Sequence, residues 1–158
     1  YAFRHPAEDR AILNIGGISN LTLLPADATR PVSGFDCGPG NCLIDHLART
    51  LHDLPYDEDG RLAASGRIHP QWVQQALESE PYFRHPPPKS TGTDHFSPQW
   101  LDARAIEALP EGDRIACVTE LTAICIADAL KSGPATPHRL HVCGGGARNQ
   151  WLMQRLRA

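Results

Sequence analysis

The 158-residue sequence predicts an α/β protein, a mixed β-sheet flanked by helices. Three observations indicate this class. Short β-rich runs fill the first 40 residues, a strong helical pattern lies near residue 120, and another β-rich run leads into a helix at the C-terminus. The order β-β-β-α, a loop-rich insert and then α-β-α favours helices packed on a mixed sheet.

The first two strands are predicted at Ala11–Ile15 and Ile18–Leu24. Gly16-Gly17 lies between them, and two glycines between β-rich runs are a hairpin signal. A third strand is predicted over Val32–Asp36, and it leads directly into the glycine-rich stretch GFDCGPGN.

Two helices are predicted from apolar residues at helical spacing. The first follows Asn41, which stands at the expected N-cap, and its apolar residues are Leu43, Ile44, Leu47 and Leu51. The second runs from about Arg114 to Lys131 with Asp113 as the expected N-cap. Its apolar face comprises Ile115, Val118, Leu121, Ile124 and Cys125.

Residues 53–97 are expected to form a loop-rich insert, because they hold six of the 14 prolines, three of them consecutive. A short helix is predicted within it at about Pro70–Ser79, and Ser97-Pro98 opens another. Loops of this length in a compact domain are usually functional or disordered. After the long helix, the run HRLHVC predicts a strand that enters Gly144–Gly146 and a last helix.

Composition excludes several classes of protein. The net charge of −3 gives no electrostatic basis for binding nucleic acid or an anionic membrane. No apolar run reaches the length of a membrane span, and the first residues do not resemble a signal peptide. The five cysteines form no C-x-x-C pair, so we expect free thiols in a reducing cytoplasm.

Three glycine loops follow predicted strands: Gly16-Gly17, the stretch around Asp36, and Gly144–Gly146. Exposed backbone N–H groups in such loops bind anions, and ligands of α/β sheets gather at the carboxyl ends of strands. A plain turn remains the alternative for each loop taken alone. Asp36 itself fits a turn cap, a catalytic base or a metal ligand.

Spacing argues against several known motifs. CGGGARN is not the dinucleotide-binding G-x-G-x-x-G, and no phosphate-binding G-x-x-x-x-G-K-[ST] occurs. No serine lies in a G-x-S-x-G elbow, and none of the eight histidines is paired at metal-ligand spacing.

Five segments resemble the anhydro-N-acetylmuramic acid kinase family. They are LNIGGISNLTLLP, GFDCGPGNCLIDHL, YDEDGRLAASGRI, PYFRHPPPKSTGTDHF and LHVCGGGARNQWLM, in family order and spanning nearly the whole chain. The resemblance implies a ribonuclease H-like lobe of the actin/hexokinase type of ATPase. It also implies an ATP- and Mg²⁺-dependent kinase that opens 1,6-anhydro-N-acetylmuramic acid with water and phosphorylates O6, in peptidoglycan recycling, as a homodimer.

The resemblance also assigns roles to residues. Asp36 matches the catalytic base, and a base of this kind typically contributes about 10²–10⁴-fold to the rate. The residues matched to nucleotide binding are Gly16, Gly17, Gly144, Gly145, Gly146 and Asn149, with Asn14 in the place of a more usual acid. The residues expected to contact the sugar are Gly38, Asn41, Lys89, Ser90 and Thr91. No metal ligand is assigned.

The chain also departs from the family pattern. The family's G-T-S-x-D-G phosphate-binding loop is absent, so residues 1–158 are interpreted as one partial domain, incomplete at both ends and inactive alone. Thr93-Asp94 stands where Arg-Glu is usual, and Lys89 fits a surface charge equally well. The alternatives are a non-catalytic nucleotide- or partner-binding module of this fold and a purely structural piece.

Overall fold

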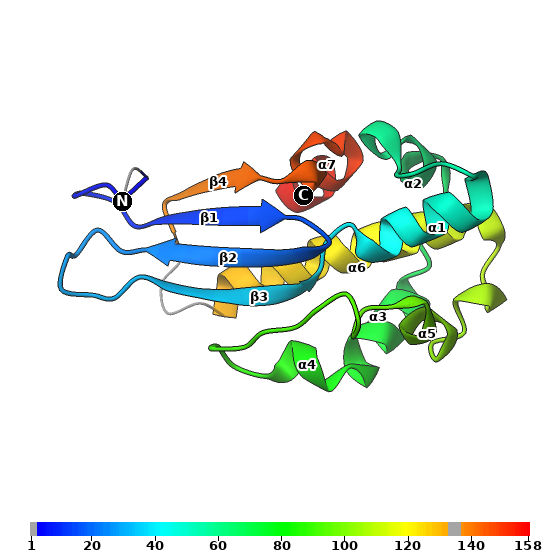
Figure 1. Ribbon diagram of the computed structural model, residues 1–158, viewed down its shortest axis with the longest axis horizontal. Coiled ribbons are helices and arrows are strands. Elements are labelled where there is room, and N and C mark those ends of the chain that lie inside the picture. The colour runs from blue at the N-terminus through cyan, green and yellow to red at the C-terminus, as the bar shows by residue number, and fades with distance from the viewer. Residues whose placement is uncertain (1–2, 133–136) are drawn as a thin grey trace.

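The computed structural model describes residues 3–132 and 137–158, and the predicted mixed α/β class is confirmed (Figure 1). The strands are β1 (Arg10–Ile15), β2 (Ile18–Leu24), β3 (Ser33–Pro39) and β4 (Arg139–Cys143). The α-helices are α1 (Cys42–His52), α2 (Arg61–Ser65), α3 (Pro70–Ser79), α4 (Pro81–Arg84), α5 (Pro98–Asp102), α6 (Glu111–Ser132) and α7 (Gln150–Arg157). Three short 3₁₀ helices are η1 (Glu58–Gly60), η2 (Ile106–Ala108) and η3 (Gly145–Arg148).

The four strands form one sheet in the order β3-β2-β1-β4. Neighbours among β1, β2 and β3 are antiparallel, whereas β4 runs parallel to β1. The hairpin predicted at Gly16-Gly17 is confirmed, since Ile15 pairs with Ser19 across the turn. A parallel fourth strand needs a long crossover connection, and the helices from α1 to α6 supply it.

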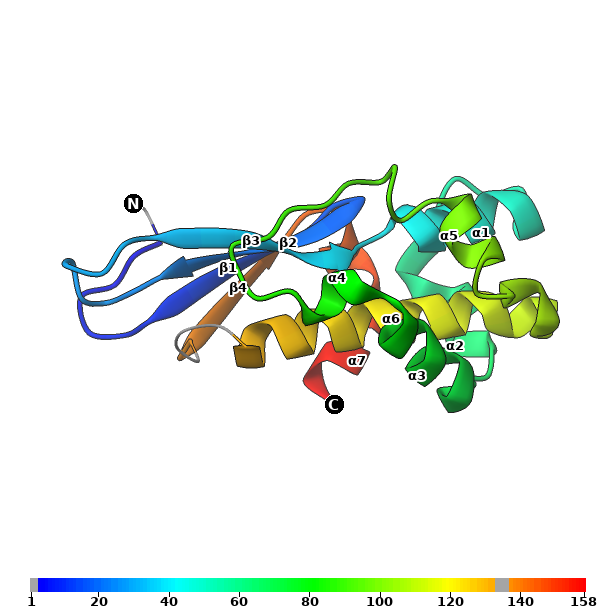
Figure 2. The same cartoon turned by 90° about the horizontal axis from the view of Figure 1, so that it is seen from below.

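The two faces of the sheet differ in chemistry. Leu13, Leu21 and Phe35 are buried on the face that α6 and α7 cover (Figure 2). The opposite face carries Asn20, which pairs in register with Asp36. The register shifts between Ser19 and Asn20, and this irregularity in the β2–β3 pairing lies beside Asp36.

Helix α6 joins two hydrophobic cores. Its 22 residues extend about 33 Å at 1.5 Å per residue, so it runs beneath the sheet and beyond it, as Figure 2 shows. Val118 and Leu121 belong to the core shared with the other helices. Ile126 and Ala129 belong to the core beneath the sheet.

One predicted helix cap is wrong, and the other stands at its predicted position without a side-chain cap hydrogen bond. Helix α6 begins at Glu111 rather than Arg114, so Asp113 lies inside its first turn. The Asp113 carboxylate instead accepts hydrogen bonds from the Arg67 N–H (2.8 Å) and the His69 ring (2.7 Å). Asn41 stands at the N-cap position of α1 but makes no side-chain cap. Both side chains form hydrogen bonds with residues that are distant in sequence. Local sequence patterns do not reveal bonds of this kind.

The insert at 53–97 contains more helix than expected. The helix predicted at Pro70–Ser79 is α3 with the same bounds, and α5 follows Ser97 as predicted. Helices α2 and α4 were not anticipated, because each has only four or five residues and shows no periodicity. Pro81 at the first position of α4 is a start signal that the sequence does carry.

All five cysteines are free thiols, as expected. Cys37, Cys117 and Cys125 are buried, Cys42 is half-buried and Cys143 is exposed. Burial raises the pKa of Cys37 to about 12 and that of Cys42 to about 11. These buried thiols are therefore protonated at neutral pH.

Replacing Leu121 by alanine should destabilise the protein by about 2–5 kcal/mol, because the side chain is fully buried where α6 packs against the other helices. Urea denaturation would measure the free energy of unfolding. Lys131→Ala, at an exposed position of the same helix, is the control and should change it by less than about 0.5 kcal/mol. Equal effects of the two substitutions would contradict the described core.

Iodoacetamide at pH 8 should modify Cys143 first, because the thiolate is the reactive form and the other thiols are shielded. Since the pKa of Cys42 is raised to about 11, its modification should accelerate about tenfold per pH unit until that pKa is reached. Mass spectrometry of the labelled peptides would follow each cysteine. Labelling of Cys37 as fast as that of Cys143 in the folded protein would contradict the placement of β3.

Candidate active site

The three predicted glycine loops meet at one end of the sheet. Strands β1, β3 and β4 all end there, and the Gly16-Gly17 turn lies among their carboxyl ends (Figure 1). The start of α1 closes against this turn. The Asn41 N–H donates to the Gly16 carbonyl (2.8 Å), and the Gly40 and Cys42 N–H groups donate to the Gly17 carbonyl (2.8 and 3.1 Å).

The Asn41 side chain links two strand ends rather than capping its helix. Its amide nitrogen donates to the carbonyl of Ile15, the last residue of β1, at 3.2 Å. A Cβ added to Gly145 would lie 3.6 Å from the same nitrogen. Asn41 therefore fixes the relative positions of the hairpin, α1 and the Gly144–Gly146 loop.

The three glycines of the Gly144–Gly146 loop differ in how much space surrounds them. Gly144 has φ +85°, and a Cβ there would lie 2.6 Å from Asn14 Oδ1 and from the Ile15 carbonyl oxygen. A Cβ on Gly146 would collide with the Ile15 side chain. Gly144 and Gly146 are therefore needed for packing on β1. A Cβ on Gly145 would make only an ordinary van der Waals contact, with Asn41, and Gly145 lines a cavity.

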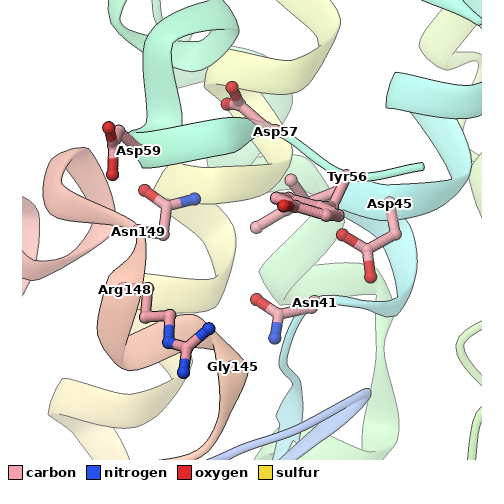
Figure 3. A pocket seen from close by; sticks show the side chains of 9 residues that line it. Asn41, Asp45, Tyr56, Asp57, Asp59, Gly145, Arg148 and Asn149 are labelled. Carbon is pink, nitrogen blue, oxygen red and sulfur yellow. The ribbon is translucent and has the colours of Figure 1, made fainter. Parts of the chain in front are cut away.

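This cavity has a volume of about 290 Å³ and lies between α1, η1 and the η3–α7 corner (Figure 3). Its lining residues are Asn41, Ile44, Asp45, Tyr56, Asp57, Asp59, Gly145, Arg148 and Asn149. Tyr56 lies across the cavity from Arg148, and the Asn149 amide nitrogen points inward. Burial raises the pKa of the Asp45 carboxyl. The cavity thus combines an aromatic ring, an amide and charges of both signs.

Asn149 has a structural task beside any ligand contact. Its Oδ1 accepts a hydrogen bond from the Leu152 N–H at 2.9 Å and so caps α7. Gly60 packs directly on it, with φ +73° and space too small for a Cβ beside Asn149 and Trp151. The η1 turn therefore closes one wall of the cavity against the start of α7. Sequence reasoning missed Gly60, although a lone glycine ahead of a helix is a signal for a special backbone conformation.

Asp36 is half-buried and is held by the segment that was expected to contact the sugar. Ser90 Oγ and the Thr91 N–H both donate to Asp36 Oδ2, at 3.0 and 2.9 Å. The Tyr82 hydroxyl donates to the Asp36 carbonyl at 2.8 Å, and the Asp36 N–H donates to the Lys89 carbonyl at 3.1 Å. Among the described residues nothing bonds to Oδ1. One carboxylate oxygen is therefore fixed and the other is free to act.

A polar row crosses the sheet from Asp36 to the glycine loops. Register pairs Asp36 with Asn20, Asn20 with Asn14, and Asn14 with Cys143, so these side chains share one face. The Cys143 thiol lies 3.8 Å from Asn14 Oδ1. Asn20 was missed by the sequence analysis, because a two-residue loop at Gly16-Gly17 would pair Asn14 with Ser19, whereas the structure pairs Asn14 with Asn20. The row connects the carboxylate to the Gly144–Gly146 loop.

Lys89 and Gly38 lie beside Asp36, where Lys89 makes contacts within its own segment and Gly38 is buried. Lys89 Nζ donates to the Tyr82 and Phe83 carbonyls at 3.2 and 3.5 Å and lies over the Tyr82 ring. Burial lowers the pKa of the Lys89 ammonium. Gly38 is buried, with Phe83 packed on it. Lys89 thus closes the loop, and binding of a substrate carboxylate by it stays a prediction.

Within residues 3–132 and 137–158, no helix is long and apolar enough to cross a bilayer. The same residues bring no three His, Cys, Asp or Glu side chains together around a metal-sized space.

The family model described as anhydro-N-acetylmuramic acid kinase matches residues 1–158. The chain belongs to this kinase family. Curated relatives named anhydro-N-acetylmuramic acid kinase include those of Cupriavidus pinatubonensis (48% identical over 98% of this chain), Variovorax paradoxus (50% over 99%) and Xanthomonas axonopodis (48% over 96%). The chain spans 42%, 43% and 40% of the lengths of these three kinases. The recognition drawn from the five sequence segments is confirmed.

Gly60→Ala should destabilise the protein by at least about 1 kcal/mol, because alanine is strained at φ +73° and its methyl group meets Asn149. Gly112→Ala is the matched control, since a Cβ there has nothing within 4 Å and the residue lies in the first turn of α6. That control should be neutral or stabilising. Urea denaturation would measure both, and equal stability of the two variants would contradict the closed wall at η1.

Proposed function

We propose that the full-length protein is an ATP-dependent kinase that opens 1,6-anhydro-N-acetylmuramic acid and yields N-acetylmuramic acid 6-phosphate and ADP. The observation that carries this proposal is the Asp36 carboxylate within β3, with Oδ2 fixed by Ser90 and Thr91. Membership of the kinase family supports the same reaction. We place the activity in the cytoplasm, in peptidoglycan recycling.

Asp36 acts as the general base through Oδ1. It takes a proton from the water whose oxygen bonds to the anomeric carbon, while the bond from that carbon to O6 breaks. O6 then forms the new bond to the γ-phosphorus, and ADP leaves. Ser90 and Thr91 hold the carboxylate so that its free oxygen has one direction, and a base positioned in this way typically contributes about 10²–10⁴-fold to the rate.

The sugar is proposed to bind on the open face of the sheet beside Asp36. Asn20 lies next to Asp36 there, and Asn41 marks the boundary toward the nucleotide side. Ser90 Oγ already donates its hydrogen to Asp36, so a contact with the sugar would have to form while that hydrogen bond is kept. Gly38 contributes close packing behind the carboxylate rather than a side-chain contact.

ATP is proposed to bind from the Gly16-Gly17 turn to the cavity at Gly145 and Asn149. The cavity beside Gly145 and the inward Asn149 amide fit a nucleoside, and the turn leaves backbone close to the phosphates. ATP supplies the transferred phosphoryl group. Mg²⁺ commonly binds through substrate phosphates with few protein ligands, so we assign no metal-ligand set to this chain.

The mixed sheet with α6 and α7 on one face is compatible with a ribonuclease H-like lobe of the actin/hexokinase type. We propose that residues 1–158 are part of such a lobe and that turnover requires the full-length protein. The homodimer implied by the resemblance is retained as a proposal.

Asp36→Asn in the full-length protein should lower kcat about 10²–10⁴-fold, because an amide does not take the proton from water. ADP release would be followed with Mg²⁺ and 1,6-anhydro-N-acetylmuramic acid, and ATP binding would be measured separately and should not change. Asp27→Asn, in an exposed loop, is the control with the same change of charge.

Two outcomes would overturn the proposal. If Asp36→Asn keeps most of its activity, the base lies elsewhere. If the unmodified protein binds ATP but releases no ADP with the sugar, it is a non-catalytic nucleotide-binding module.

A further inference from the structure

We propose that Glu80 is a positioning residue for Asp36: its buried carboxylate anchors both ends of the segment from which Ser90 and Thr91 reach Asp36. The inference rests on the proposed function of Asp36 as the base. It assigns a role to a residue that contacts neither Asp36 nor the open face of the sheet.

The Glu80 carboxylate accepts from donors in α4, in the 85–97 segment, and in α5 and the turn after it. Oε1 accepts from the Tyr82 N–H of α4 at 3.0 Å. Oε2 accepts from Trp100 Nε1 of α5 at 2.7 Å, from Arg104 Nη2 at 3.0 Å, and lies 3.2 Å from His95 Nε2. Glu80 is only 4% exposed. Capping of α4 needs only the bond from the Tyr82 N–H. The contacts with Trp100, Arg104 and His95 therefore indicate that the carboxylate also joins separate segments of the chain.

One route from Glu80 to Asp36 runs through α4. Glu80 immediately precedes this helix and fixes its first turn. Tyr82 then donates its hydroxyl to the Asp36 carbonyl at 2.8 Å. Lys89 Nζ donates a hydrogen bond to the Tyr82 carbonyl at 3.2 Å and so attaches the loop to the same helix. A shift of α4 would therefore move both Tyr82 and the loop relative to Asp36.

The second route fixes the far end of the loop. His95 lies against Glu80, and the neighbouring Phe96 is buried. The Phe96 ring stacks on Phe83 with a centroid separation of 5.6 Å and an interplanar angle of 10°, and it meets Tyr82 edge-on at 5.9 Å. Residues 85–94 are thus held at both ends by groups that contact Glu80 or α4. Ser90 and Thr91 lie between these two anchors.

The charge of Glu80 matters as well as its shape. Burial alone raises the pKa of Glu80, but the hydrogen bonds from Trp100, Tyr82 and His95 outweigh burial, and the pKa is lowered. The carboxylate is therefore ionised at neutral pH, opposite the partly buried guanidinium of Arg104. A neutral amide of the same size would leave Arg104 without its charged partner and would replace an acceptor by a donor.

The test is Glu80→Gln in the full-length protein, with Glu78→Gln as the matched control. Glu78 is exposed on α3 and undergoes the same change of charge. We expect Glu80→Gln to lower kcat about 10–100-fold, because displacement of a catalytic group by about 1 Å has effects of this size. Hydrogen exchange of the Thr91 amide, which donates to Asp36, should accelerate about tenfold. ATP binding by Glu80→Gln should be unchanged, and Glu78→Gln should have unchanged kcat and unchanged Thr91 exchange.

The two readouts separate this inference from the proposed function. Unchanged Thr91 exchange in Glu80→Gln overturns the inference, and so does faster exchange with unchanged kcat. If Asp36→Asn proves active, the proposed function fails, while Thr91 exchange still reports whether Glu80 anchors the loop. Should Glu80→Gln not fold, Trp100→Phe removes one donor and keeps the ring; accelerated Thr91 exchange would support the anchor, and unchanged exchange would overturn it.

Discussion

Burial of α6 on two sides is the interaction on which the rest of the structure depends. One part of the helix packs against the helices of the insert and another part packs against the sheet. A single helix therefore sets the positions of the sheet and of the insert helices relative to each other. The paired Arg155 and Glu120 side chains, with two hydrogen bonds of 2.6 and 2.8 Å, attach α7 to the same helix. Because β3, α1, α2, α3 and α7 all pack on α6, the elements that carry or adjoin Asp36, the glycine loops and the insert share one support.

The site is built largely from backbone contacts at the carboxyl end of the sheet. Gly144 and Gly146 lie so close to β1 that no side chain fits, and the Gly16-Gly17 carbonyls receive the N–H groups at the start of α1. Contacts of this kind leave little freedom for adjustment, since main-chain atoms move only with their elements. This rigidity is what a site needs when most of its work is positioning.

The carboxylate of Asp36 depends on a segment that joins the sheet from outside. The strand places Asp36 on the open face, but its orientation comes from Ser90 and Thr91, more than fifty residues later in the chain. Three consecutive prolines precede this segment and limit its own hydrogen bonding, so side chains such as Tyr82 and Lys89 attach it. The proline-rich insert therefore forms one wall of the proposed active site.

Local patterns in the sequence were sufficient for the β1–β2 hairpin and for α3, because glycine turns and proline starts act over a few residues. The third strand was placed correctly but its predicted end was wrong, since β3 continues past Asp36 to Pro39. The quoted segments were also sufficient for the family. The partners of Asn41, Asp113 and Glu80 were decided only by the tertiary structure. Each of these polar groups bonds to residues between about 20 and 50 positions away, and such a bond exists only once packing has brought the segments together.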